Sequence, residues 1–535
     1  MKKKDYGILF FAAFVICSVI AVIQKTPGYM DAEYYFAGGV QLNKGHGFQE
    51  EFIWNYLNQP EELPRPSNSY WMPLVSILAW LGMKVSGATS FNSARIILFV
   101  FACLISPLTA WFSYSLSQKR WAGFFSGVIA LFPIFYSAYL ITTDIFAISM
   151  FLGIVWFQVA HFLYIFTQQN VSRFKVLLFG FGFIGALLYL TRVDGIIWVV
   201  IGGGYVWYLL KLRADQGDGR NIQSSLLEFG LYTGGVFVLI APWLIRNYIA
   251  WDTFFPSGAS KTLWFINYDD LYSYPADKIT YARWVQNGMI SAIRVRFWAL
   301  GQNVQTLIGV HGGIIFFPLV VAGLYKLRID LRVKLGVLIW GIIFLLMTII
   351  FPFAGSRGGF FHAATAVQPL FWAAAPIGLG RFISWGEKRR GWNKQQALPI
   401  FSVGIIVLAL TVSFYIFQDR VVGMDWWLPV WNSSNHKYQK IEDELRRLGL
   451  SDGDLVLINN PPGYWIASER SALSVPDGGV ETVIKLANDF NVHYLVLEKD
   501  HPIGMNELYL SPSNFANFDK LSTVEDAQIF MISNE

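Results

Sequence analysis

Three acidic residues at the ends of long apolar segments are the side chains of this chain best placed to do chemistry. Asp31 and Glu33 follow the first apolar segment, and Asp144 follows two threonines between later ones. A carboxylate near the bilayer surface is costly to keep unless it pairs or reacts there, and it could serve as a general base toward a hydroxyl group. The alternative is that Asp31 and Asp144 cap helices. A capping carboxylate can also face a site.

Cationic side chains follow other apolar segments. Arg246 and Arg357 each end an apolar run, and a guanidinium group binds phosphate through its planar fork. The glycines around Arg357 would let a ligand approach the backbone closely. Lys261 and His362 are weaker candidates for the same role. The alternative for all four is that they reach toward lipid head groups.

A further pair, Arg192 and Asp194, either contacts a ligand or forms an internal ion pair. The loop at 24–69 and the residues that close it are rich in aromatic side chains, including Trp71, and an interfacial aromatic belt explains many of them.

The composition places these residues in a polytopic membrane protein. The chain has 535 residues, 54% hydrophobic and 14% charged, whereas soluble proteins are about a quarter charged. Twelve apolar runs approach the ~20 residues that a spanning helix needs. They cover 7–23, 70–86, 93–116, 121–141, 145–166, 176–191, 195–210, 228–249, 304–325, 335–353, 362–380 and 398–417.

Loop charge predicts the side on which each connection lies. Basic residues cluster near 119, 173, 211, 326 and 381, which predicts that these loops are cytoplasmic. Lys2–Lys4 precede an uncleaved first helix, so the N-terminus is also expected in the cytoplasm. The candidate residues, the loops 24–69 and 251–303 and the C-terminal tail then share the extracytoplasmic face. Twelve crossings would contradict this arrangement, so either 70–86 does not cross fully or one crossing is missing between 87 and 144.

The composition changes near 418. Strand-like runs at 454–458 and 493–497 alternate with helical spacing at 437–448 and 480–490. We therefore predict an all-α transmembrane bundle of about 11–13 helices over 1–417, followed by a small extracytoplasmic α/β domain over 418–535.

Several functions are poorly supported. The chain has no Walker loop, no His-Glu-x-x-His, no paired cysteines for zinc and no Gly-x-Ser-x-Gly elbow. The net charge of +5 is spread over short loops and indicates no nucleic-acid partner. A secondary transporter or flippase of a lipid-linked or polar solute is the main alternative to an enzyme, and a non-catalytic assembly or sensor protein is another.

In the order and spacing of its motifs the chain resembles the GT-C superfamily of integral-membrane glycosyltransferases, in particular the branch of protein O-mannosyltransferases and lipid A aminoarabinose transferases. The motifs that carry the resemblance are Asp31 to Tyr35, Tyr70 to Leu74, Asp144, Thr191 to Gly195, Pro242 to Asn247 and Arg357 to Pro369.

The resemblance implies a GT-C-like fold and a sugar donor linked to polyprenyl phosphate. It implies transfer of a hexose or pentose, with inversion, to a lipid, glycan or protein hydroxyl at the extracytoplasmic surface of the plasma membrane. Carried onto this sequence, the catalytic residues are Asp31, Glu33 and Asp144. Arg246, Arg357, Lys261 and His362 bind the donor phosphate, and Arg192, Asp194, Tyr35, Trp71 and Asn247 contact substrate. No metal or other cofactor is expected to be required, although some members of the superfamily use a divalent metal.

Overall fold

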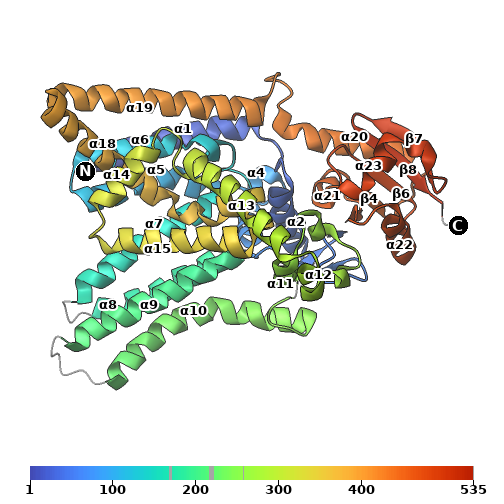
Figure 1. Cartoon of the computed structure of the whole chain (residues 1–535), viewed down its shortest axis with the longest axis horizontal. Coiled ribbons are helices and arrows are strands. Elements are labelled where there is room, and N and C mark those ends of the chain that lie inside the picture. Colours follow the sequence, from blue (N-terminus) through green and yellow to red (C-terminus); the bar gives the residue numbers. More distant parts are fainter. Residues whose placement is uncertain (168–171, 216–221, 257, 534–535) are drawn as a thin grey trace.

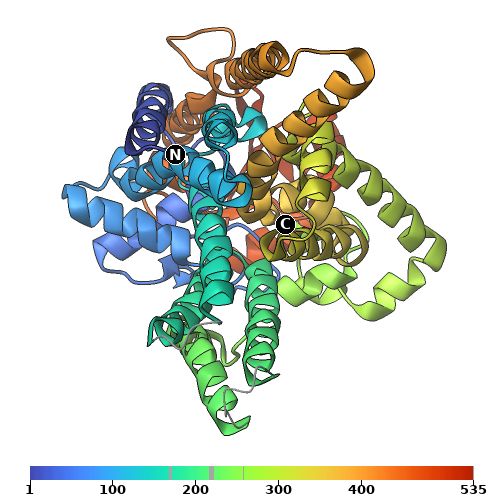
Figure 2. The same ribbon diagram turned by 90° about the vertical axis from the view of Figure 1, so that its left-hand side faces the viewer.

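The computed structural model of the chain describes residues 1–167, 172–215, 222–256 and 258–533. One position of the predicted 251–303 loop and the last two of 418–535 lie outside these ranges. A bundle of long helices forms one end of the molecule and a small α/β domain forms the other (Figure 1). Figure 2 views the bundle from the end opposite to this domain.

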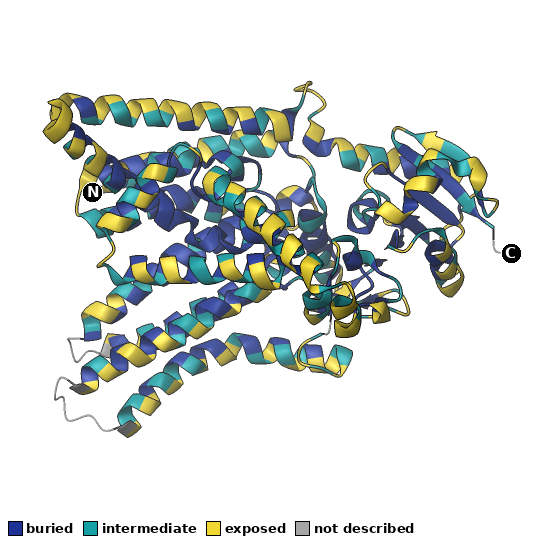
Figure 3. Ribbon diagram, in the orientation of Figure 1, coloured by how far each residue is buried: buried dark blue, intermediate teal, exposed yellow. Residues whose placement is uncertain are grey.

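Eight of the described helices are long and apolar enough to cross a membrane. They are α1 (Lys3–Ile23), α5 (Ile96–Ser117), α7 (Phe146–Thr167), α8 (Ser172–Thr191), α9 (Ile196–Asp215), α10 (Ile222–Trp251), α15 (Leu331–Leu345, extended by a π turn to Ile350) and α19 (Lys394–Phe417). Large apolar side chains remain exposed on them, for example Phe11 on α1 and Tyr415 on α19, at 68% and 70% (Figure 3). Such a surface suits lipid rather than water, and the protein is a multi-pass membrane protein.

Further helices complete the bundle and differ from the predicted runs. They are α3 (Leu74–Ser86), α6 (Arg120–Leu131), α13 (Met289–Thr306), α14 (Phe317–Lys326) and α18 (Gln368–Arg390). The run predicted at 121–141 stops at Leu131 and gives way to a 3₁₀ turn at Ile134–Ala138, because Pro133 cannot continue the helix. The run at 304–325 is divided by a π turn at Leu307–His311.

The positions of the two termini bear on the conflict in the number of crossings. With 13 residues, α3 is about 20 Å long, shorter than a hydrocarbon core of about 30 Å, as are α6 with 12 residues and α14 with 10. The N-terminus and the C-terminal domain lie at opposite ends of the bundle (Figure 1), as an odd number of crossings requires. Cys17 and Cys103 are free, buried thiols.

The C-terminal domain is built on a six-stranded sheet whose order is β2-β5-β4-β6-β8-β7. Four strands pair in parallel: β2 (Phe52–Ile53), β5 (Ala472–Ser474), β4 (Val456–Ile458) and β6 (Tyr494–Leu497). Strand β8 (Ala527–Ile532) pairs antiparallel with β6 on one side and with β7 (Phe518–Val524) on the other. Its helices are α20 (Ser433–Arg447), α21 (Pro461–Ser468), α22 (Val480–Phe490) and α23 (Asn506–Leu510). The α/β character is as predicted. The edge strand β2 is not, because it comes from the first external loop.

The elements between bundle and domain position the site. They are α2 (Met30–Lys44), the β1–β3 hairpin (Gln49–Glu50 and Arg65–Pro66), the short helices α11 (Gly258–Lys261) and α12 (Tyr281–Gln286), and α16 (Pro352–Ala354) and α17 (Phe360–Ala363). They lie where the bundle meets the C-terminal domain (Figure 1).

Candidate functional site

The first predicted acid lies in the first turn of α2 and does not cap it. The helix begins at Met30 after Tyr29 in extended conformation, and no side chain caps it. The capping interpretation of Asp31 is therefore wrong. The carboxylate of Asp31 is 30% exposed and lines a cavity of about 140 Å³.

The second predicted acid is held beside the first by the two threonines that precede it. The Thr142 hydroxyl donates to the Pro27 carbonyl at 3.1 Å, and the Thr143 hydroxyl donates to the Ala32 carbonyl at 2.7 Å. These bonds fasten the segment before α7 to the start of α2. Asp144 is 1% exposed, and it accepts hydrogen bonds from the Tyr29 hydroxyl at 2.5 Å and from the Ile145 amide at 2.6 Å. Asp144 thus binds backbone at the start of α7 and also faces the site.

His362 on α17 joins the two carboxylates. Its Nε2 lies 3.5 Å from Asp144 Oδ2 and 3.7 Å from Asp31 Oδ2. Its Nδ1 lies 2.9 Å from the carbonyl of Gly358, and a carbonyl only accepts, so Nδ1 carries a proton. Gly358 has φ +110°, a conformation that favours glycine. The sequence ranked His362 as a weak candidate for binding phosphate, whereas the structure brings it to the acids.

Because Nδ1 carries a proton, the charge of this cluster depends on whether Nε2 of His362 carries one too. In a neutral ring Nε2 would turn a lone pair toward two carboxylates, so the arrangement is favourable when Nε2 also carries a proton. Burial lowers the pKa of His362, but the adjacent carboxylates of Asp144 and Asp31 outweigh it and the pKa is raised. Burial also raises the pKa of Asp31, to about 6, against the opposing effect of His362. The cluster therefore carries protons that isolated side chains would release.

The same three side chains are suited to hold a divalent cation. One ligand atom from each of Asp31, Asp144 and His362 lies within 4.8 Å of the others, and Nε2 has no hydrogen-bond partner in the described part of the chain. Two carboxylate oxygens and one imidazole nitrogen are a common donor set for such ions. The residues present therefore fit a metal ion, which the prediction from the sequence did not require.

Two arginines line the cavity beside Asp31. Arg192 pairs with Asp194, with 2.6 Å between Nε and Oδ2, so the internal ion pair considered from the sequence is present. This pairing and nearby charges raise the pKa of Arg192 against the effect of burial. Arg357 lies 4.8 Å over the ring of Tyr268 and, within the described ranges, has no hydrogen bond or ion pair. A free guanidinium beside a carboxylate cluster is available to an anionic ligand.

The aromatic side chains of the cavity come from two loops. Trp54 and Trp71 stack at 4.0 Å, with Tyr70 against Trp54. Tyr268 and Tyr272 come from the 251–303 segment. Of these residues the sequence singled out only Trp71 as a substrate contact, because interfacial aromatic residues carry no signal that separates a binding role from a belt. Tyr29, which binds Asp144, was missed for the same reason.

Several predicted residues lie away from the cavity lining. The Arg246 guanidinium donates to the carbonyls of Phe48 and Ser67 at 2.9 and 2.7 Å, and its partner Asn247 donates to the Phe254 carbonyl. Both side chains thus hold loops in place. Arg246 does not line the cavity beside Asp31, and its phosphate role stays a prediction.

Glu33, Tyr35 and Lys261 also lie outside this lining. Glu33 is 3% exposed and accepts a 2.7 Å hydrogen bond from the Asn460 side chain of α21, so it faces the C-terminal domain. Tyr35 is buried against Trp71. Lys261 is partly buried on α11, which lowers its pKa.

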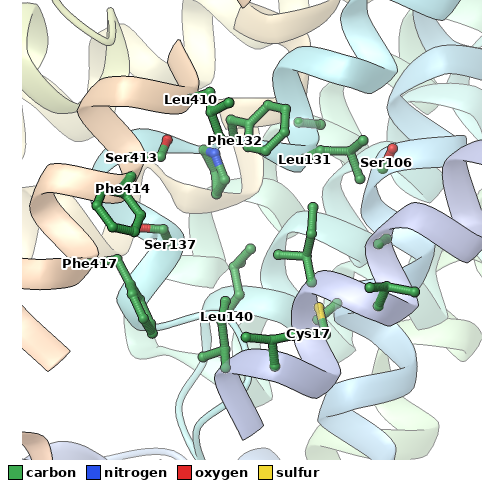
Figure 4. Close-up of a pocket in the computed structure, with 18 of the residues that line it drawn as sticks. Cys17, Ser106, Leu131, Phe132, Ser137, Leu140, Leu410, Ser413, Phe414 and Phe417 are labelled. Carbon is green, nitrogen blue, oxygen red and sulfur yellow. The ribbon is translucent and has the colours of Figure 1, made fainter. Parts of the chain in front are cut away.

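A separate crevice lies inside the bundle between α1, α5, α6 and α19 (Figure 4). Its volume is about 280 Å³, and its lining is apolar apart from a few hydroxyl and thiol groups such as Ser413 and Cys17. At one end of the crevice, Ile23 and Phe417 pack in one cluster with Tyr29, Tyr139 and Trp431, and Tyr29 donates to Asp144. The crevice suits hydrocarbon and has no group for acid–base chemistry.

Comparison with known proteins gives matches among solved structures only. No protein-family model and no curated protein matches the chain. ArnT from Cupriavidus metallidurans bound to undecaprenyl phosphate aligns over 99% of this chain and 98% of its own, with 12% identity and a TM-score of 0.56. The apo oligosaccharyltransferase of Archaeoglobus fulgidus aligns over 95% and 71%, with 13% identity and a TM-score of 0.56.

The same oligosaccharyltransferase, tethered with an acceptor peptide containing the NVT sequon, aligns over 100% of this chain and 74% of its own at 14% identity and a TM-score of 0.53. At these identities the likeness is one of fold, and it extends over the bundle and the C-terminal domain together. This protein therefore shares the fold of ArnT and of this oligosaccharyltransferase.

Proposed function

We propose that this protein is a membrane glycosyltransferase that moves a hexose or pentose from a polyprenyl-phosphate donor to an acceptor hydroxyl. The observation that carries the proposal is the cluster of Asp31, His362 and Asp144, which opens into a cavity lined by Arg192 and Arg357. A base and a free cation share one small cavity, as displacement of a phosphate by a hydroxyl requires.

The transfer uses these side chains in distinct roles. Asp31 accepts the proton of the acceptor hydroxyl as its oxygen bonds to the anomeric carbon, while the bond from that carbon to the donor phosphate oxygen breaks. Attack from the face opposite the phosphate inverts the anomeric centre. Arg357 stabilises the charge that develops on the departing lipid phosphate. Asp144 and His362 position Asp31, and Tyr29 and the two threonines position Asp144.

The raised pKa of His362 supports the expectation that no metal is required, because a protonated imidazole would offset the charge of the two carboxylates. If a divalent ion binds, the same three residues would hold it, and it would neutralise the two acids. The basic loops favour a cytoplasmic N-terminus. They place the site and the C-terminal domain on the extracytoplasmic side of a plasma membrane, and a lipid, glycan or protein serves as acceptor.

The test is sugar transfer from a panel of radiolabelled polyprenyl-phosphate sugars in membranes that contain the wild type or Asp31→Asn. Glu62→Gln is the matched control, because Glu62 is an exposed acid of the same external loop. We expect transfer to fall at least 100-fold in Asp31→Asn, while binding of undecaprenyl phosphate persists. Transfer that survives the substitution would remove Asp31 as the base. Absence of transfer from every donor would favour a transporter or flippase.

A further inference from the structure

A second, larger cavity lies between the membrane bundle and the C-terminal domain. Its volume is about 590 Å³, enough for two or three sugar rings or a short peptide. The bundle side contributes the segment before α2 and the 251–303 segment, and the domain side contributes the carboxyl ends of β4, β5 and β6 with the start of α20.

This cavity adjoins the one that contains Asp31. Met30, Tyr268, Tyr272 and Arg357 line both cavities. A molecule bound in the larger cavity therefore lies next to the cavity of Asp31, and Arg357 lies at the junction.

The two cavities differ in charge. Arg192, Arg357 and the imidazole of His362 line the inner cavity beside Asp31. The outer cavity adds three carboxylates, those of Asp269, Glu498 and Asp500, and in the described residues its only arginine or lysine is Arg357 at the junction.

The three carboxylates of the outer cavity are engaged to different degrees. Asp269 Oδ2 accepts a hydrogen bond from the Ile503 amide at 3.1 Å, and Glu498 pairs with Lys437 from outside the lining. Asp500 is exposed, and its carboxylate has no hydrogen bond or ion pair in the part of the chain that the structure describes. Asp500 can therefore accept from a ligand.

Unpaired hydroxyl groups line the cavity together with the Asp500 carboxylate. Among the described residues, the side-chain hydroxyls of Tyr268, Tyr272 and Ser434 have no hydrogen-bond partner, and all three residues line the cavity. A hydroxyl both donates and accepts, as the hydroxyls of a sugar do, whereas a carboxylate only accepts. Tyrosine rings also offer apolar faces beside their polar ends.

We propose that the outer cavity is the acceptor site and that it takes the terminal sugars of a glycan whose residues are neutral or carry amino groups. This inference rests on the proposed function and names its acceptor class. The charges of the two cavities direct the two substrates to different places. The carboxylates of the outer cavity repel an anionic acceptor and the donor phosphate, whereas the arginines of the inner cavity attract that phosphate. Asp500 sets the charge preference, and Tyr268, Tyr272 and Ser434 bind sugar hydroxyls.

The test is calorimetric binding to the purified full-length protein with four probes. They are maltotriose, the glucosamine trimer, the galacturonic acid trimer and a threonine-containing tetrapeptide. We expect the first two to bind, the cationic trimer more tightly, and the anionic trimer and the peptide not to bind. Asp500→Asn should weaken binding of the glucosamine trimer about tenfold, and Asp500→Lys should reverse the preference for cationic over anionic trimer. Asp519→Asn is the matched control, because Asp519 is an exposed acid on β7 outside the cavity.

Each outcome decides the inference. Binding of the peptide without any saccharide, a preference for the anionic trimer, or affinities that Asp500 variants do not change would overturn it. Saccharide binding without sugar transfer from any donor would overturn the proposed function and leave the site as a glycan-binding site. Transfer by a protein that binds no saccharide would leave the function standing and refute the acceptor class.

Discussion

Glu33→Gln is expected to stabilise the protein above neutral pH and to leave sugar transfer intact. Glu33 is 3% exposed, and its carboxylate accepts one hydrogen bond, from Asn460 at 2.7 Å. Burial raises its pKa from an ordinary 4.5 to about 7, Asn460 opposes this effect, and the charge of Glu498 adds to it. Glutamine retains an oxygen that can accept from Asn460, and it cannot ionise.

The size of the expected stabilisation follows from how far the pKa of Glu33 is raised. Each unit is worth about 1.36 kcal/mol, so the displacement of Glu33 corresponds to ~3 kcal/mol. Because the pKa is raised in the folded state, the stability that protonated Glu33 contributes is fully present below pH 4.5 and is lost as the pH rises through about 7. The difference between Glu33→Gln and wild type should therefore be small at pH 4.5 and reach ~3 kcal/mol above pH 7.

Thermal unfolding of both proteins in detergent between pH 4.5 and 8.5, followed by tryptophan fluorescence, measures this difference. Glu62→Gln is the control because Glu62 is exposed, and its profile should overlay that of the wild type. A variant that is less stable than the wild type at pH 8 would show that Glu33 is not a buried, proton-binding acid. Loss of transfer without a change in stability would instead restore the catalytic role predicted from the sequence.

Three other substitutions separate roles within the site. Arg246→Met should lower stability by about 2 kcal/mol, because it removes three hydrogen bonds from a charged donor, to Phe48, Ser67 and Asn247. It should leave the affinity for undecaprenyl phosphate unchanged in a detergent binding assay, and a selective loss of affinity would make Arg246 a phosphate ligand. Arg357→Lys should weaken that affinity about tenfold, since lysine lacks the planar fork, whereas Arg420→Lys at the same end of the bundle should not. His362→Gln should reduce kcat for transfer about 100-fold. The wild type should keep its rate after dialysis against EDTA. A rate that EDTA abolishes and a divalent ion restores would show that a metal ion supplies the positive charge between the two acids.

The sequence predicted the parts of this structure that local chemistry determines. Apolar runs identified the long helices, and the acidic residues that end two of them do meet, because Asp31 and Asp144 lie beside their respective runs on one face. The ends of the shorter runs were not predictable in the same way. Pro133 and the π turn at Leu307–His311 interrupt segments whose hydropathy is continuous.

Contacts between distant segments could not be predicted from the sequence. Arg357 follows the apolar run at 335–353 and His362 begins the run at 362–380, and only the fold reveals that His362 reaches the acids whereas Arg357 lies over Tyr268. Arg246 has the sequence features of a phosphate ligand, yet its donors reach carbonyls about 180 and 200 residues earlier in the chain. A guanidinium group serves an anion or a backbone carbonyl equally well, so its position near a membrane end cannot decide between them.

The boundary predicted at 418 divides the sequence but not the structure around the site. The two-residue strand β2 pairs in parallel with β5, so the first external loop completes the edge of the C-terminal sheet. Tyr56 in that loop also donates to the Ser474 carbonyl at the end of β5. The helix that carries Asp31 is thus fastened on one side by Thr143 of the bundle and on the other by Asn460 of the domain. Because Glu33 and Asp31 lie two residues apart on α2, a shift of the domain would move the acid that faces the cavity, and the domain helps to set the geometry of the site.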